Sequence, residues 1–246
     1  MVYLFDGTKE GFLTAFLRAF SDENAVVSSQ NIQLPLGETP VFIHTDPTLV
    51  QKAQARLLSF DRDCLHDLDI LLRSGMQGHE QIAFSYFRLL AQEKRPIGKR
   101  LAEPCVFAAV ECMKKVGHEI HKLHGFIRFM ETQSGALYAP FSPDNDICDL
   151  LLPHFKRRLP EYPFVLHDIA RKKAAVYDGK NSFVAPLSQA DVLLSASEEE
   201  WQALWKQYYQ AVNIPSRERL KQMRGYMPVR YWKFLPEKQT PPKGFE

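Results

Sequence analysis

The segment His118–Phe129, HEIHKLHGFIRF, decides the fold, because the spacing of apolar residues changes within it. From Pro104 up to this segment, apolar residues recur at helical spacing, and Gly125 is the type of residue that ends a helix in a left-handed cap. Beyond it the chain breaks into short stretches rich in β-branched and aromatic residues, bounded by Gly, Pro, Asp or Asn. We therefore expect a helix over roughly 104–124 that leads into a sheet.

Toward the N-terminus the sequence predicts mostly helix. A short strand, VYLFD, comes first and feeds a helix, and Asp46 with Pro47 then provides an N-cap and a first-turn proline. Two further helical segments follow at roughly 61–74 and 79–93, separated by the breakers in SGMQG. The first hundred residues or so are therefore expected to be mainly helical.

Toward the C-terminus, short segments between residues 126 and 186 predict a mixed sheet, mostly antiparallel because most connections are short. A helical piece, DICDLLLPHFKRRL, is inserted among the strands. Farther on, Ser197 and Glu200 match a capping box. The apolar residues that follow share one helical face: Trp201, Leu204, Trp205, Tyr208 and Val212. Helices are therefore expected after the sheet.

Together these patterns predict an α+β fold in a single compact domain over residues 1–246. A helical part, 1–124, is expected to pack on a sheet-containing core, 125–190. C-terminal helices at 195–235 and a loose tail at 236–246 complete the expected domain.

The composition is that of an ordinary globular protein, because 246 residues with 45% hydrophobic side chains suffice for a core. No apolar run approaches the roughly 20 residues of a membrane span. The opening residues, MVYLFDGTKEGF, lack the features of a signal peptide. We therefore expect a cytoplasmic protein with no membrane contact.

The four cysteines form no CxxC pair and no zinc-ribbon spacing; they are Cys64, Cys105, Cys112 and Cys148. Free, buried thiols are expected, because unpaired cysteine behaves as a small hydrophobic residue. An iron–sulfur or disulfide role is the alternative.

The net charge of +2 hides an asymmetry along the chain. Residues 1–92 contain 7 Lys and Arg against 11 Asp and Glu, whereas residues 93–246 contain 24 against 18. A basic surface attracts polyanions by neutralising phosphates and releasing counterions. The excess in the C-terminal part hints at nucleic acid as a partner.

The three histidines of the opening segment do not converge on one point. At 100° per residue, His124 lies at the centre of the apolar stripe, His121 about 60° from it and His118 about 120° from it. Histidines near a helix C-terminus favour the helix dipole and the free carbonyls. A metal held by His121 with histidines from elsewhere is the alternative; we predict no metal and no cofactor.

Arg128 is expected on a strand, on the same face as Phe126 and Met130. A buried charge left alone is costly, so its guanidinium group needs a partner. The candidates are a protein carboxylate, such as Asp168 or Glu131, or a bound phosphate or carboxylate ligand.

Two segments place basic residues after a histidine, HFKRR at 154–158 and HDIARKK at 167–173. Such runs form either a solvated face or a phosphate-binding edge, because arginine offers a fork of donors that matches phosphate oxygens. We predict that Arg157, Arg158 and Arg171 contact phosphates.

A third basic segment, IPSRERLKQMRGYMPVRYWKF, interleaves bases with aromatic residues. Its bases are Arg217, Arg219, Lys221, Arg224, Arg230 and Lys233, and its aromatic residues are Tyr226, Tyr231, Trp232 and Phe234. This combination suits a single-stranded or flipped nucleotide, which needs stacking and phosphate contact. Core aromatic residues under a basic rim would produce the same pattern.

Sequence motifs for catalysis are scarce. The chain has no GxSxG elbow and no glycine-rich phosphate loop. Acid–base chemistry near neutral pH would use side chains such as His121, His154, His167, Glu119 or Asp168, and no spacing selects among them.

Several stretches resemble an uncharacterised bacterial family of proposed DNA metabolism or DNA repair proteins. They are FDGTKEGFLTAF, IHTDP, EIHKLHGFIRF, ALYAPFSPDNDI, LPHFKRRLPEYPFVLHDIARKKAAVYDG and IPSRERLKQMRGYMPVRYWKFLPE, which together span almost the whole chain. The matching positions include Glu119, His121, Gly125, Phe126, Arg128, Phe129, His154, Phe155, Arg158, Asp168, Arg171, Met227, Pro228, Tyr231 and Trp232. The last block departs from the family pattern, which has an asparagine shortly after the first arginine of the block, where this chain has Arg219.

The resemblance implies a setting more than a mechanism. Members of that family are associated with a proposed DNA-modifying radical SAM protein, and a similar domain occurs fused to uracil-DNA-glycosylase-like domains. A role in DNA repair or metabolism beside a radical SAM partner is therefore implied. The two outer histidines, His118 and His124, lie outside the family pattern, which disfavours a three-histidine metal site.

The leading hypothesis is a DNA repair or metabolism protein that binds nucleic acid in a basic cleft. Phosphates are expected to meet Arg128, Arg157, Arg158, Arg171, Arg217 and Arg230, and bases are expected to stack on Tyr231 or Trp232. A rival is a hydrolase or nucleotide-processing enzyme that uses His121, His154 and Asp168 in an acid–base or metal centre. A third is an adaptor that docks the radical SAM protein without touching DNA.

Overall fold

The computed structural model describes residues 1–29, 39–214 and 219–239. The chain divides into two compact units, Met1–Gly117 and His118–Glu246, which are described separately. Helices and a mixed sheet confirm the α+β fold. The single compact domain, with its helical part packed on the sheet, stays a prediction.

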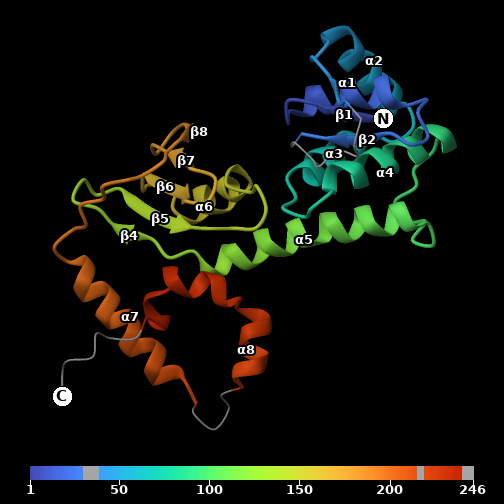
Figure 1. Cartoon of the computed structure of the whole chain (residues 1–246). Helices are drawn as coiled ribbons and strands as arrows, with labels where there is room; N and C mark the ends of the chain where they lie inside the picture. Colours follow the sequence, from blue (N-terminus) through green and yellow to red (C-terminus); the bar gives the residue numbers. More distant parts are fainter. Residues whose placement is uncertain (30–38, 215–218, 240–246) are drawn as a thin grey trace. The chain divides into compact units, whose positions relative to one another are not determined.

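The first unit contains a three-stranded parallel sheet in the order β2-β1-β3; Figure 1 labels β1 and β2. Its strands are β1 (Val2–Leu4), β2 (Val26–Ser28) and β3 (Val41–Phe42). Only β1 was predicted; the other two strands are too short for alternation of apolar and polar residues to be visible.

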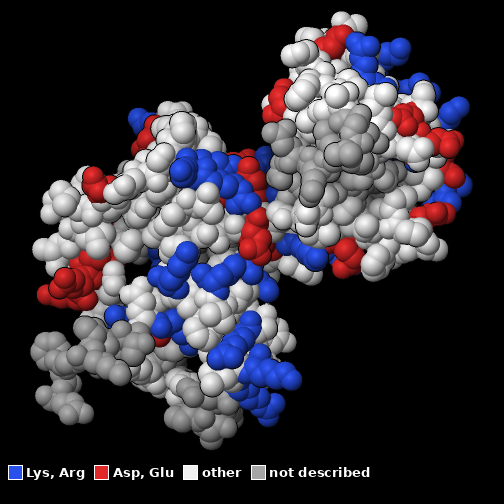
Figure 2. Space-filling model, viewed as in Figure 1, with Lys and Arg blue, Asp and Glu red and all other residues white. Residues whose placement is uncertain are grey.

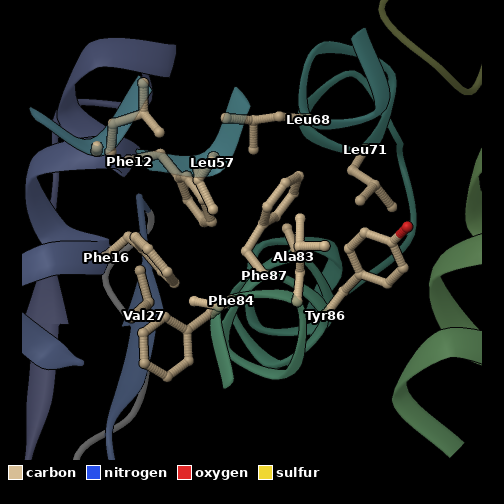
Figure 3. Close-up of a cluster of buried hydrophobic side chains, with 14 of the residues drawn as sticks. Phe12, Phe16, Val27, Leu57, Leu68, Leu71, Ala83, Phe84, Tyr86 and Phe87 are labelled. Atoms are coloured by element: carbon tan, nitrogen blue, oxygen red, sulfur yellow. The ribbon is translucent and has the colours of Figure 1, made fainter. Parts of the chain in front are cut away.

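Four helices complete this unit: α1 (Lys9–Ala19), α2 (Pro47–Leu58), α3 (Cys64–Leu72) and α4 (His79–Glu93). The predicted cap is confirmed, because the Asp46 carboxylate accepts a hydrogen bond from the backbone N–H of Thr48 at 2.9 Å, and Pro47 opens α2. The core lies where α1 meets α4, and its rings pack edge to face, as Phe12 and Phe87 do at 6.4 Å (Figure 3).

The long helix α5 (Pro104–Phe126) confirms the predicted change of period, but not its cap. Gly125 lies inside the helix, without the positive φ of a left-handed cap. The backbone N–H of Ile127 still donates to the carbonyl of Leu123 at 3.1 Å, so helical hydrogen bonding continues past the glycine. A strand is likewise absent at Arg128, which precedes the first strand of the second unit.

The second unit contains the predicted mixed sheet, with its strands in chain order. They are β4 (Met130–Glu131), β5 (Leu137–Phe141), β6 (Phe164–Asp168), β7 (Lys173–Tyr177) and β8 (Ser182–Pro186). Only β5 and β6 pair in parallel, and the crossover between them carries the short helix η1 (Asp149–Leu151) and α6 (Leu152–Arg158). The inserted helix is therefore confirmed.

The C-terminal helices are α7 (Glu198–Val212), α8 (Leu220–Tyr226), η3 (Val229–Phe234) and η4 (Pro236–Lys238). α7 begins after Ser197, but the predicted capping box does not form, because this serine makes no side-chain cap bond. Its hydroxyl group donates instead to Glu131 at 3.4 Å. Part of the expected loose tail is the ordered helix η4, and 240–246 lie outside the described residues.

All four cysteines are free thiols and three of them are buried, as expected. Burial raises the pKa of the Cys64 and Cys148 thiols to about 11, so both stay protonated and unreactive near neutral pH. Among the described residues, no helix is both long enough and apolar enough to cross a membrane.

Candidate nucleic-acid interface

A buried carboxylate on α5 joins three elements of the second unit. Glu119 accepts hydrogen bonds from the Tyr231 hydroxyl at 2.6 Å, from Nη2 of Arg230 at 2.8 Å and from the backbone N–H of Asn145 at 2.8 Å. Burial raises the pKa of Glu119, but the hydrogen bonds from Tyr231, from the backbone of Asp144 and from Arg230 outweigh it and hold the pKa below its usual value. We call these residues the Glu119 hub.

The hub contradicts one prediction, base stacking on Tyr231, and leaves phosphate contact at Arg230 a prediction. Tyr231 is fully buried with its hydroxyl group on Glu119, so it presents no face on which a base could stack. Arg230 is held between Glu119 and Asp144, with the second contact at 2.9 Å, so its charge is balanced within the protein. At these two positions the segment therefore follows the alternative interpretation: Tyr231 is a core aromatic residue, and Arg230 is a basic residue at the rim above it.

Trp232 is half-buried and also partly engaged. Its indole N–H donates to the carbonyl of Met227 at 3.2 Å, and the ammonium group of Lys238 lies 5.6 Å from its ring centroid. Stacking of a base on Trp232 stays a prediction.

Arg128 is paired with a carboxylate that the sequence did not suggest. Its Nη2 donates to Glu237 at 2.7 Å, instead of to Asp168 or Glu131. The other carboxylate oxygen of Glu237 accepts the indole N–H of Trp205 at 2.9 Å. Burial raises the pKa of Glu237, but the hydrogen bond from Arg128 helps to hold it below the usual range, so the pair is charged.

Arg171 is engaged in a similar way. It donates to the fully buried Asp168 at 3.2 Å, and to the carbonyls of Pro143 at 3.0 Å and Asp144 at 2.5 Å. Burial raises the pKa of Asp168 despite this pairing. The predicted catalytic carboxylate therefore binds an arginine of its own strand end, and no hydrogen bond joins it to His121 or His154 among the described residues.

The structure brings His154, on α6, against His124, at the end of α5. Their rings stack in parallel, with centroids 4.0 Å apart and planes 10° apart. Burial lowers the pKa of both imidazoles. For His124 the neighbouring His154 adds to this effect, and for His154 the charges of Arg157 and Arg158 do. Both rings are therefore neutral near pH 7.

The remaining predicted catalytic histidine, His121, is exposed on α5. His167 is buried, with Nδ1 at 2.6 Å from the Tyr138 hydroxyl and Nε2 at 3.0 Å from the carbonyl of Leu187, as a structural histidine would be. Within the described ranges, no three His, Cys, Asp or Glu side chains gather where they could hold a metal ion.

Two of the predicted phosphate-binding residues are free. Arg157 and Arg158 end α6, are exposed, and form no ion pair with any residue that the structure describes. Arg217 lies outside the described residues. The expected set thus separates into three arginines balanced by internal carboxylates and two that face solvent.

Arg158 lies on the edge of an open groove of about 670 Å³ within the second unit. One wall comes from α7, and the opposite side comes from α6 and the segment that follows it. The aromatic residues that line it are Phe129, Phe155, Tyr162, Trp201 and Trp205; the polar residues include Arg128, Arg158, Glu198 and Gln202. We call this the α6–α7 groove.

A second group of bases lies on α8 and η3, where Figure 2 shows Lys and Arg side chains gathered on the visible face. The exposed bases of these elements and of the residue before α8 are Arg219, Lys221, Arg224, Arg230 and Lys233, and Arg230 alone among them forms ion pairs with described residues. Tyr226, at the end of α8, is 71% exposed.

Sequence reasoning missed the aromatic residues that are actually accessible. Trp201 and Tyr162 are exposed and line the groove, whereas the predicted Tyr231 is buried. A signal for Trp201 was present in the apolar face predicted for its helix, but the sequence does not say whether such a face is covered. Nothing comparable marked Tyr162, which lies in the connection between α6 and β6.

Residues 77–237 match the model of a family described as DUF4130, a domain of unknown function. This match takes in α5, the whole mixed sheet, the Glu119 hub and both walls of the α6–α7 groove. Comparison with curated proteins and with solved structures gave no match. Because the family model covers well over half of the chain, the protein belongs to the DUF4130 family.

Proposed function

We propose that the second unit binds nucleic acid through Arg157 and Arg158, and that the protein acts in DNA repair or DNA metabolism together with a radical SAM protein. The binding proposal rests on the two unpaired arginines at the end of α6, of which Arg158 lines the α6–α7 groove. The biological setting rests on the sequence resemblance described above.

The unpaired arginines carry the proposal because their charge is not balanced by the protein. Both lower the pKa of His154, which is the effect of a positive potential at the end of α6. Arg128, Arg171 and Arg230, in contrast, each face an internal carboxylate. Two exposed arginines that are neighbours in the chain, one of which lines an open groove, suit the oxygens of a phosphate backbone.

The exposed bases of α8 and η3 form a second group of positive charges in the same unit. Lys221 and Arg224 lie three residues apart on α8, so they project from the same side of the helix. A strand held by Arg157 and Arg158 would meet further positive charges there, and each additional phosphate that is neutralised steepens the dependence of affinity on salt.

Fluorescence anisotropy with labelled single-stranded and double-stranded DNA, repeated over a salt series, tests the proposal. The double variant Arg157→Ala/Arg158→Ala is expected to bind more weakly. On a single strand, the slope of log K against log salt should fall by about 0.7 for each phosphate that the variant no longer neutralises. The matched control is Arg56→Ala/Arg62→Ala, which removes the same charge from the exposed surface of the first unit.

Equal losses of affinity in the two double variants would mean that only net charge matters and would refute the assigned site. A wild-type protein whose affinity does not change with salt would refute nucleic-acid binding itself. Co-purification with a radical SAM protein in the absence of DNA affinity would instead favour the adaptor hypothesis.

A further inference from the structure

We infer that the α6–α7 groove holds one unstacked nucleobase of a single strand, with the adjoining phosphate at Arg158. The inference deepens the proposed nucleic-acid binding and rests on it. It assigns to this groove a ligand class that phosphate contacts alone do not require.

The size of the groove fits a ligand of this kind. Its volume of about 670 Å³ lies in the range of roughly 300–1,000 Å³ that is typical of small-ligand sites. It is open to solvent along α7, so a base attached to a continuous strand can enter without separation from its backbone.

The walls present aromatic side chains of which Trp201 and Tyr162 are mostly exposed, whereas the guanidinium group of Arg128 lies over the ring of Trp205, 5.1 Å from its centroid. Trp201 is 61% exposed, Tyr162 is 54% exposed and Trp205 is 38% exposed, and all three line the groove. Several large aromatic side chains around one concavity are characteristic of a binding site, whereas single exposed aromatic residues scattered over a surface are ordinary. Aromatic rings bind every base through its π-face, without a preference for sequence.

The polar groups of the groove favour a nucleobase over a simple apolar ligand. Nε2 of Gln202 donates to the buried carboxylate of Glu198 at 2.9 Å, and Glu198 is itself fixed by the backbone N–H of Glu131 at 2.7 Å. This contact orients the Gln202 amide, whose carbonyl oxygen and second N–H have no other partner among the described residues. A base edge, which carries donors and acceptors side by side, can use both.

Charge sets the orientation of the ligand. Arg128 also lines the groove, but Glu237 balances it, so the uncompensated positive charge lies at Arg158 on α6. A nucleotide would therefore direct its phosphate toward α6 and its base toward Trp201 and Trp205 on α7. A neutral aromatic ligand would make no use of this polarity.

The test compares two fluorescent strands of equal length, one of thymidine nucleotides and one of abasic sites, which keep the sugar and phosphates but lack bases. The wild-type protein is expected to bind the thymidine strand about tenfold more tightly, as loss of base stacking predicts. Trp201→Leu should abolish this difference, and Trp201→Phe should keep most of it. Phe183→Leu, which removes an exposed aromatic residue of β8 outside the groove, is the matched control.

Because Trp201 is mostly exposed, its replacement is expected to leave the fold intact, which circular dichroism can verify. Equal affinity for the two strands, or equal effects of Trp201→Leu and Phe183→Leu, would overturn the base site, while salt-dependent binding would still support the proposed function. If neither strand binds, calorimetry with a nucleoside monophosphate provides the test. Saturable binding that Trp201→Leu removes would support the base site in the groove, and the absence of any heat of binding would overturn it.

Discussion

Two helices of equal length, α4 and α7, differ in whether their apolar face is buried. Each has 15 residues and an apolar face. In α4 that face is buried, with Phe84 and Phe87 in the core of the first unit (Figure 3). In α7 the only buried residue is Glu198, and Trp201 and Tyr208 are exposed. An apolar stripe thus predicts a helix without saying what covers it, and an uncovered stripe indicates a surface available for binding.

The largest expected effect contrasts the two stripes directly. Phe87→Ala should lower the free energy of unfolding by about 3–5 kcal/mol, because it opens a cavity among packed rings. Trp201→Ala should cost less than about 1 kcal/mol, because the side chain is mostly exposed already. Urea unfolding followed by circular dichroism measures both, and similar costs would show that the face of α7 is covered in solution.

The next effect concerns the Glu119 hub, which ties the second unit together through polar contacts. Glu119→Gln should lower the free energy of unfolding by about 2 kcal/mol. Breaking a fully buried ion pair costs more than this, but Arg230 is 41% exposed, so solvent screens its charge. Tryptophan fluorescence reports on this unit alone, since Trp201, Trp205 and Trp232 all belong to it. Tyr231→Phe keeps the charge of Glu119 and removes one hydrogen bond to it, so it should lower the free energy of unfolding by about 1 kcal/mol. A larger loss of stability for Tyr231→Phe than for Glu119→Gln would contradict this ranking.

A smaller effect is expected where α7 is anchored. Glu237→Ala leaves Arg128 and the indole N–H of Trp205 without their partner, at a cost of about 1–2 kcal/mol. Amide hydrogen exchange should become faster in α7, with little change in the core of α4. Glu199→Ala, which removes an exposed acid of the same helix, is the control. Unchanged exchange in α7 would mean that other contacts hold it.

The smallest effect is a dependence on pH. Burial and nearby charges lower the pKa of His124 and His154 in the folded protein below the ordinary value of 6.5. Below pH 6.5 these histidines take up protons in the unfolded chain but remain largely neutral in the folded protein. The free energy of unfolding should therefore decline as the pH falls from 7 toward 5. The groups around the pair are His121, Arg157 and Arg158. Unfolding curves of the wild type and His154→Gln at several pH values measure it, and parallel pH profiles would exclude a contribution from this pair.

Local sequence patterns predicted most of the elements. The switch of period after His124 placed the end of α5 and the start of the sheet within a few residues, and Asp46 with Pro47 placed the start of α2. Such signals lie in adjacent residues, so a single sequence contains them. The Ser197 cap failed because Glu131, 66 residues away in the chain, offers its hydroxyl group another partner.

The candidate site was predictable only in part, for a related reason. Arg157 and Arg158 were identified from the sequence and are free, but other arginines expected to bind phosphate are balanced by acids far along the chain. Arg128 meets Glu237 and Arg230 meets Glu119, at separations of 109 and 111 residues. Local charge counting cannot reveal such pairs, and it cannot show that Tyr231 is buried while Trp201 is exposed.

The parallel pairing of β5 with β6 has a consequence for how the proposed binding site forms. Because β5 pairs with β6, the connection between them, which carries Arg157 and Arg158 at the end of α6, is closed only when β6 joins the sheet. A growing or partly unfolded chain therefore has the two arginines but no groove beside them. The proposed binding of a nucleic acid in the groove therefore requires the completed sheet of the second unit.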